Sequence, residues 1–222
     1  MSMADRKRVG VLISGRGSNL QALIDAHAQP GYPAQIVRVI SNVPDVFGLE
    51  RAKAAGIPTA VISHKDFSDR ESFERAINAQ LEADGVEIVC LAGFMRVLTA
   101  YFVSHWSGGL LNIHPSLLPL FKGLHTHERA IQEGVRFAGC TVHFVVPEMD
   151  SGPIIAQAVV PVMQDDTPDL LAARVLEQEH VIYPLALALV CEGKTRIEHG
   201  TVRLSGTTAQ TQALINPIAS LA

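Results

Sequence analysis

The sequence is short of cysteine, of net charge and of long apolar runs, and each shortage argues against a class of protein. Its three cysteines are odd in number and widely spaced among apolar residues, which predicts reduced, buried thiols and not a disulfide framework. A formal charge of −4 argues against a general nucleic-acid binder. The longest apolar candidate for a membrane span, residues 185–191, falls far short of the ~18 residues that such a helix needs. We therefore expect neither nucleic-acid nor membrane partners.

The composition predicts a globular chain with one main domain. No apolar segment follows the basic residues at the N-terminus, so no secretory signal is visible and we expect a cytoplasmic protein. The 222 residues, of which 48% are hydrophobic, suffice for a sizeable core, and neither a repeat nor a linker divides them. We predict one domain over residues 1–204, with halves at about 9–113 and 114–204. A loosely ordered tail rich in Ser, Thr, Ala and Gln follows over residues 205–222.

Short apolar runs alternate with amphipathic segments along the first half of the chain. The predicted strands are residues 9–14, 35–40, 59–62 and 87–92, and a fifth strand passes through residues 112–114. The predicted helices are residues 47–55, 70–83 and 99–106. Repeated βα units with short links predict an α/β fold with a Rossmann-like, doubly wound, mostly parallel sheet. The second half is β-rich, with strands over 139–146 and 152–161, a long C-terminal helix over 168–192 and a weak strand pair near 196–204.

A glycine loop separates the first predicted strand from a helical segment. Residues 9–14 lead into Gly15-Arg16-Gly17-Ser18-Asn19, after which apolar residues follow a helical period. This order aims free backbone N–H groups and the positive end of a helix at an anion. A dinucleotide loop needs a small residue where Leu20 stands and an acid after the second strand, but that strand ends on Ser41-Asn42. We expect one phosphate group to bind here, and a tight turn without a ligand is the alternative.

A second polar stretch ends the strand through residues 112–114. Pro115 terminates this strand directly after His114, and Asn112 leaves the strand on the same face as His114. A neutral hydrogen-bond donor thus lies beside a proton donor at the carboxyl end of a strand, where open α/β sheets bind ligands. Taken alone, the pair also fits a strand end with satisfied hydrogen bonds. Asp150, which precedes Ser-Gly-Pro, also fits a plain turn.

Several motifs in a fixed order resemble the phosphoribosylglycinamide formyltransferases of the folate-dependent formyltransferase family. These motifs are residues 14–22, 91–96, 111–119, 123–127 and 150–153, extended by 178–180 and Tyr183-Pro184. The Asn-x-His pair and the later Asp are common to the family. Gly17-Ser18-Asn19 and the Gly-Leu-His-Thr-His stretch single out the ribonucleotide enzymes. Many members carry a basic residue, an aromatic and a proline between Pro119 and Gly123, where this chain has Leu120-Phe121-Lys122, so the resemblance leaves the role of Lys122 open.

The resemblance implies transfer of a formyl group from 10-formyltetrahydrofolate, as co-substrate, to the amine of glycinamide ribonucleotide in de novo purine biosynthesis. We also expect a monomer or homodimer, and no metal. The amine attacks the formyl carbon directly, so the site must stabilise an oxyanion and move a proton. Asn112 would donate a hydrogen bond from a neutral amide and His114 from an imidazolium. Asp150 would hold His114 charged and steer a water that relays the proton.

The resemblance further implies two binding sets. The ribonucleotide set is Gly17, Ser18, Asn19 and Glu179, and the folate set is Arg70, Met95, Arg96, Val97, Leu98, Val146, Pro147, Glu148 and Met149. Apolar spacing alone would place Met95, Val97 and Leu98 in the core, and we expect them to serve both as core and as a wall for the pterin. Arg70 at a helix start opposes the helix dipole, which favours a ligand role for its charge.

Alternative functions remain to be tested. His125, His127 and His143 could hold zinc, but no cysteine pair or carboxylate spacing accompanies them, and we expect them to support the His114–Asp150 pair. A formyltetrahydrofolate hydrolase would carry a regulatory domain before the first strand. A methionyl-tRNA formyltransferase would carry an RNA-binding domain after the last element, and we expect neither domain here. A non-catalytic ligand-binding domain would not need all three catalytic residues.

Overall fold

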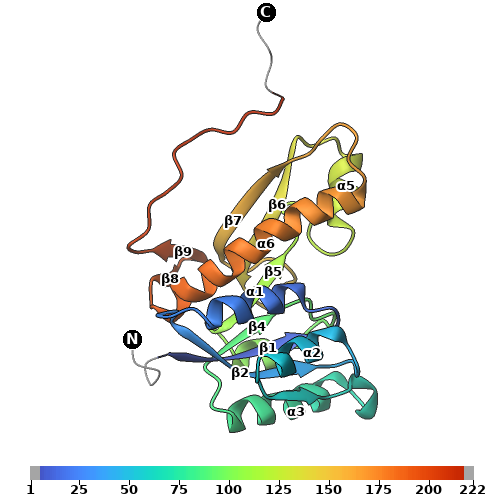
Figure 1. Ribbon diagram of the computed structural model, residues 1–222, viewed down its shortest axis with the longest axis vertical. Helices are drawn as coiled ribbons and strands as arrows, with labels where there is room; N and C mark the ends of the chain where they lie inside the picture. The colour runs from blue at the N-terminus through green and yellow to red at the C-terminus, as the bar shows by residue number, and fades with distance from the viewer. Residues whose placement is uncertain (1–5, 218–222) are drawn as a thin grey trace, which may run out of the picture.

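The computed structural model describes residues 6–217, so the ends of the predicted domain and tail, residues 1–5 and 218–222, lie outside the described residues (Figure 1). In chain order the elements are β1 (Lys7–Ile13), α1 (Ser18–His27), β2 (Ala34–Ser41), α2 (Phe47–Ala54), β3 (Thr59–Val61), a 3₁₀ turn (His64–Asp66), α3 (Arg70–Ala83), β4 (Ile88–Leu91), α4 (Ala100–His105), β5 (Leu110–His114), α5 (Thr126–Gln132), β6 (Phe137–Phe144), β7 (Ile154–Pro161), α6 (Pro168–Cys191), β8 (Thr195–Glu198) and β9 (Thr201–Leu204).

Seven strands form one sheet in the order β3-β2-β1-β4-β5-β6-β7. The first five are parallel, whereas β6 runs antiparallel to β5 and β7 antiparallel to β6. The predicted doubly wound, mostly parallel sheet with a β-rich C-terminal part is confirmed. Strand order reverses between β1 and β4, and in such sheets the ligand crevice lies at the carboxyl ends of the strands flanking this point.

Helices cover both faces of the sheet, and each face has its own apolar core. On one face α1, α2 and α6 pack on residues such as Val11 and Leu111. On the other face α3 and α4 pack on residues such as Leu12 and Leu110. Neighbouring residues of one strand enter different cores because successive side chains in a strand point to opposite faces.

The long helix α6 joins the two halves of the fold. It begins where the sequence predicts, with Pro168 in its first turn and the Thr167 hydroxyl accepting a hydrogen bond from the Leu170 N–H group. In Figure 1, α6 (orange) runs beside β6 and β7 and meets α1. The buried Tyr183 hydroxyl donates to the carbonyls of Leu91, 3.0 Å away, and Leu111, 3.3 Å away, so α6 is tied to β4 and β5. No helix within residues 6–217 is both long enough and apolar enough to cross a membrane.

All three cysteines are buried and free, as the sequence predicts. Burial raises the pKa of the Cys140 and Cys191 thiols to about 12, and raises the pKa of Cys90 further. The nucleophilic thiolate is therefore a minor species at neutral pH for each of them.

The C-terminal part forms a small hairpin and then an irregular segment. β8 and β9 pair antiparallel, which confirms the predicted strand pair. Residues 205–217 contain no helix or strand and arch away from the sheet in Figure 1 (red). The Asn216 side chain donates to the Arg136 carbonyl, 2.7 Å away, so the segment touches the domain beside the start of β6. The single-domain boundaries and the loose order of the tail stay predictions.

We expect Tyr183→Phe to lower the free energy of unfolding by about 1–2 kcal/mol, because a buried hydroxyl that joins α6 to two strands is lost without a change in packing. Chemical denaturation of the full chain measures the change. Tyr101→Phe is the matched control, since the exposed contact from Arg75 to this hydroxyl is 3.5 Å long and its loss should cost less than about 0.5 kcal/mol. Equal losses in both variants would contradict the proposed tie.

Candidate active site

Asn112 and His114 leave β5 on the face that Leu110 shares with the second core, whereas Leu111 and Ile113 enter the first core. The α3–α4 layer covers Leu110. The loop between β6 and β7, residues 145–153, reaches His114 on this face through Asp150. On this face, beyond the helix layer, His114 therefore faces a residue of a loop and not of a helix.

The Asn112 amide is oriented by His143, its partner across the β5–β6 ladder. The Asn112 Nδ2 atom lies 3.2 Å from His143 Nε2, and His143 Nδ1 lies 2.9 Å from the Phe144 carbonyl oxygen. Because a carbonyl only accepts, Nδ1 carries the proton and Nε2 accepts from the Asn112 amide. Burial lowers the pKa of His143 and favours this neutral ring. One N–H of Asn112 is thus used by the protein and the second is left for a ligand.

His114 is buried with both ring nitrogens facing oxygen acceptors. Its Nε2 atom lies 3.0 Å from the Phe121 carbonyl oxygen and its Nδ1 atom 3.5 Å from Asp150 Oδ2. The same Asp150 oxygen accepts from the Gly123 N–H group at 2.8 Å. The imidazolium form satisfies both acceptors, and a substrate oxygen would share or displace one of them. The structure brings the three predicted catalytic residues together, with Asp150 opposite His114.

The glycine loop ends at the first turn of α1 with open backbone donors. Gly17 precedes the helix in the left-handed conformation (φ 70°), and no side chain caps the helix start. Helix geometry leaves the N–H groups of this turn without partners inside the helix, so they point at an anion position. A Cβ atom on Gly17 would lie 2.7 Å from the Gly48 Cα atom, and the Gly48 N–H group donates to the Gly15 carbonyl at 3.1 Å. Close packing against α2 therefore requires glycine at position 17.

Glu179 reaches this loop from α6. The Asn19 side-chain amide donates to Glu179 Oε2 at 2.6 Å, and both side chains are buried. Burial raises the pKa of Glu179. The Asn19 Oδ1 atom is buried and has no hydrogen-bond partner among the described residues, as expected of a group kept for a ligand. The residues of the predicted ribonucleotide set, Gly17, Ser18, Asn19 and Glu179, thus lie together.

The predicted folate segment after β4 lies next to the glycine loop. The Met95 N–H group donates to the Ser14 hydroxyl at 2.8 Å, and this hydroxyl donates to Asn42 at 2.6 Å. Met95 is 70% exposed and Val97 63% exposed, so the expectation that they also form core is wrong. The backbone turns outward after β4, which presents both apolar side chains to solvent. Leu98 packs against the second core as expected.

The rest of the predicted folate set is spread over the β6–β7 loop, the start of α3 and the segment after β4. Val146, Pro147, Glu148 and Met149 lie in the loop that carries Asp150, where Met149 is exposed, and Arg96 is half-buried in the segment after β4. Arg70 is the exposed first residue of α3, which Asp69 caps. No contact within residues 6–217 joins Arg70 to the catalytic group. Its predicted role in folate binding stays a prediction.

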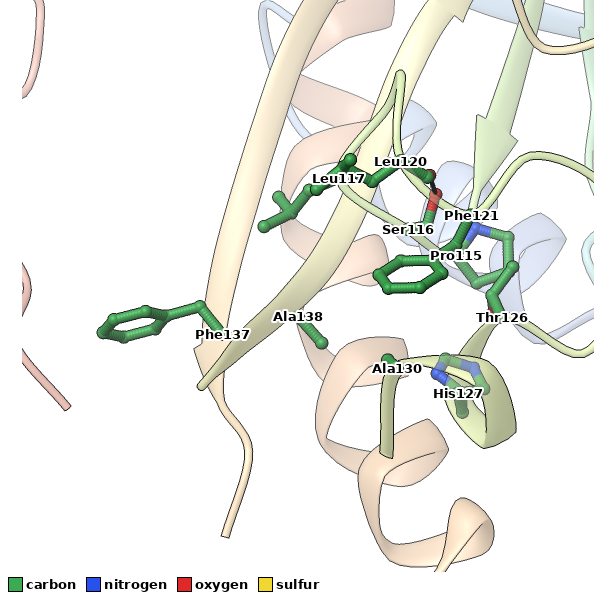
Figure 2. Close-up of a pocket in the computed structure, with 10 residues that line it drawn as sticks. All are labelled: Pro115, Ser116, Leu117, Leu120, Phe121, Thr126, His127, Ala130, Phe137 and Ala138. Atoms are coloured by element: carbon green, nitrogen blue, oxygen red, sulfur yellow. Dashed lines mark hydrogen bonds between the residues drawn. The ribbon is translucent and has the colours of Figure 1, made fainter. Parts of the chain in front are cut away.

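The three remaining histidines differ from one another. His143 orients Asn112 and also lies within electrostatic reach of His114 and Asp150. The exposed His125 pairs with Glu128 at 3.4 Å, so the expectation that it supports the His114–Asp150 pair is wrong. His127 is close to His114, and both burial and the His114 charge lower its pKa. Figure 2 shows His127 lining an apolar pocket together with Phe121, whose carbonyl contacts His114. Among the described residues, no group of three or more His, Cys, Asp or Glu side chains is placed to hold a metal ion.

The sequence interpretation missed two supporting contacts. Opposing positions on β5 and β6 pair Asn112 with His143, and this register cannot be deduced without knowing which strands are neighbours. The Ser14–Asn42 contact had a partial signal, because the second strand ends on the polar residues Ser41-Asn42, of which only Ser41 forms a local turn contact, with Val43. Both contacts orient groups that face the ligand crevice.

The doubly wound sheet, the open glycine loop after β1 and the polar group at the end of β5 together define an α/β group-transfer domain. A family model described as formyl transferase matches residues 7–187. The phosphoribosylglycinamide formyltransferase of Escherichia coli strain K12 is 47% identical over 196 residues, which are 88% of this chain and 92% of that protein. The chain belongs to the formyl transferase family, as its motifs predict.

A solved structure and a larger protein extend the comparison. Glycinamide ribonucleotide transformylase 1 from Symbiobacterium toebii superposes with a TM-score of 0.88 at 44% identity, covering 91% of this chain and 95% of that one. The trifunctional purine biosynthetic protein adenosine-3 of Drosophila melanogaster is 54% identical over 194 residues, which are 86% of this chain. The chain spans 14% of the length of that relative, so this similarity concerns one part of a larger protein.

We expect Glu179→Gln to raise the free energy of unfolding at neutral pH, because the charge of a carboxylate whose folded pKa is raised destabilises the native state. Glutamine can still accept the hydrogen bond from Asn19. The gain should shrink as the pH falls towards about 4, where the wild-type carboxyl becomes protonated in both states. Denaturation between pH 4 and 8 measures it, with the exposed Glu177→Gln as control. A loss of stability at neutral pH, or a gain independent of pH, would contradict this account.

Proposed function

We propose that this chain is a phosphoribosylglycinamide formyltransferase, which moves the formyl group of 10-formyltetrahydrofolate to the amine of glycinamide ribonucleotide in purine biosynthesis. The observation that carries the proposal is that three polar or exposed segments lie at the carboxyl ends of three neighbouring strands: the glycine loop after β1, the Met95 segment after β4, and the Asn112–His114 pair at the end of β5. The similarity to enzymes of this activity over most of the chain supports it.

The ribonucleotide would place its phosphate at the start of α1. Backbone N–H groups after Gly17 and the Ser18 hydroxyl are donors for phosphate oxygens, and the helix dipole adds to their attraction. Asn19 and Glu179 would contact the remainder of the molecule, since Asn19 keeps a buried oxygen and Glu179 an acidic group beside the loop. The phosphate would then lie at one end of the crevice and the amine would extend towards β5.

The folate would lie between the segment after β4 and the loop after β6. Met95, Val97 and Met149 are exposed apolar side chains on these two segments, and burying them against a flat heterocycle supplies hydrophobic free energy. Arg96, Leu98, Val146, Pro147 and Glu148 complete the proposed contact set, with Arg70 at the start of α3 as a further basic group for the anionic folate.

The reaction would use the polar group at the end of β5. The amine nitrogen bonds to the formyl carbon, and the carbonyl oxygen becomes an oxyanion that takes hydrogen bonds from Asn112 and His114. The Oδ2 atom of Asp150 holds Gly123 and faces His114, while Oδ1 is available to a water that takes the proton from the amine. The bond from carbon to the folate nitrogen then breaks, and that nitrogen receives the proton. A metal-free site, a cytoplasmic location and a monomeric or homodimeric state stay predictions.

Turnover of 10-formyltetrahydrofolate, or of its stable 5,8-dideaza analogue, should depend on glycinamide ribonucleotide in a buffer containing chelator. Deformylated folate should appear only when the ribonucleotide is present, because the ribonucleotide supplies the attacking amine. Equal product without it would identify a hydrolase, in which water is the acceptor. Binding of both substrates without product would identify a ligand-binding domain. Either result would overturn the proposal.

We expect His114→Ala to lower kcat by about 100- to 1000-fold, because one preorganised donor to the oxyanion is removed. Ribonucleotide affinity, measured by calorimetry on the same variant, should stay within about twofold because the phosphate site is on another strand. His105→Ala on α4, where the side chain pairs with Glu82 at the surface, is the control and should keep wild-type turnover. Near-normal kcat in His114→Ala would remove this residue from the mechanism.

A further inference from the structure

Two loops meet beside His114, and successive residues of one hold successive residues of the other. The Gly123 N–H group donates to Asp150 Oδ2 at 2.8 Å. The preceding residue, Lys122, donates from Nζ to the Ser151 hydroxyl at 2.5 Å. Because the donor is an ammonium group, this hydrogen bond is charge-assisted. Lys122 and Gly123 together therefore hold the backbone segment that carries the Asp150 carboxylate. We call this pair of hydrogen bonds the clasp.

The segment that Lys122 holds is conformationally strained. Asp150 has a left-handed backbone (φ 50°), which is unfavourable for a residue with a Cβ atom. The Ser151 hydroxyl accepts from Lys122 and donates its own proton to the Met149 carbonyl at 3.0 Å, so it closes a ring of contacts around Asp150. Such a conformation persists only where its surroundings enforce it. The ammonium group is one of the contacts that enforce it.

Lys122 is itself fixed from α5. The Arg129 guanidinium donates to the Lys122 carbonyl at 2.7 Å and lies 5.4 Å from the centre of the Phe121 ring. The Phe121 carbonyl in turn faces His114. The base of the lysine side chain is thus connected to a helix, and its tip is connected to the loop of Asp150.

We propose that Lys122 is a positioning residue, which acts through Ser151 to hold the Asp150 carboxylate opposite His114. The proposal rests on the proposed function in that the position of Asp150 matters for formyl transfer. It also gives a role to the lysine that stands where many related sequences carry proline. Glu148 is not the partner that matters, because its carboxylate lies 3.9 Å from the ammonium and its side chain is 78% exposed.

Kinetics of the full chain test the clasp with Lys122→Met, which keeps most of the alkyl chain, and Ser151→Ala. Each variant should lower kcat by about five- to tenfold, as expected for loss of one charge-assisted hydrogen bond, with KM for the ribonucleotide nearly unchanged. The double variant should be no slower than the slower single variant, because both substitutions remove the same contact. Lys122→Arg should recover part of the loss. Lys53→Met on α2, which removes the exposed ion pair with Glu50, is the matched control that should keep wild-type kcat.

A second measurement does not need turnover. The Gly123 N–H group donates to Asp150 Oδ2 at 2.8 Å and so reports on the position of the carboxylate, and none of the variants replaces either residue. Loosening Asp150 weakens this hydrogen bond and leaves the Gly123 amide less protected from hydrogen exchange. Exchange of the Gly123 amide in the substrate-free chain, followed by NMR, should therefore be faster in Lys122→Met and Ser151→Ala, and not in Lys53→Met.

The outcomes separate the clasp from the proposed function. Unchanged hydrogen exchange of the Gly123 amide in both variants overturns the clasp, whatever the kinetics show. Losses in kcat that multiply in the double variant also overturn it. So does a raised KM for folate in Lys122→Met together with wild-type kinetics in Ser151→Ala, because that result would mean that Lys122 contacts folate directly. Faster exchange of the Gly123 amide in both variants of a chain that shows no ribonucleotide-dependent turnover would support the clasp and reject the proposed function.

Discussion

β5 is hydrogen-bonded to a parallel strand on one side and to an antiparallel strand on the other, and the placement of the polar site depends on this change of direction. The parallel neighbour β4 ends beside Asn112 and sends the Met95 segment outward. The antiparallel neighbour β6 places His143 opposite Asn112, and a short loop then returns Asp150 to His114. A parallel strand in the place of β6 would need a crossover connection of a dozen or more residues. Such a connection could not return a short loop to β5.

Burial and charge are balanced differently at the two ends of the crevice. At the β5 end, the neutral His143 lies between Asn112 and the Phe144 carbonyl, and His114 faces Asp150 at 3.5 Å, so these buried polar groups have partners within the protein. At the glycine-loop end, Glu179 is buried at a cost that its contact with Asn19 offsets only in part, as the direction of its pKa shows. This cost is consistent with a group retained for a ligand and not for stability.

A short chain of contacts joins the segments that follow β1, β2 and β4. Ser14 follows β1, accepts from the Met95 N–H group after β4 and donates to Asn42 after β2. Segments that are proposed to contact different substrates are therefore fixed to each other at the point where the strand order reverses. Such fixing favours reactions in which two substrates must meet in one orientation, because it removes freedom before they bind.

Local pattern determined much of this protein from the sequence. Apolar periodicity located the strands and helices, Thr167-Pro168 marked the start of α6, and the motif around Asn112 and His114 indicated the site, because these signals depend on near neighbours in the chain. Tertiary structure alone decided that His143 supports Asn112, that Met95 and Val97 face solvent, and that Lys122 reaches Ser151. The physical reason is that spacing along a strand sets the face on which a side chain lies, whereas its partner depends on which strand or loop packs beside it.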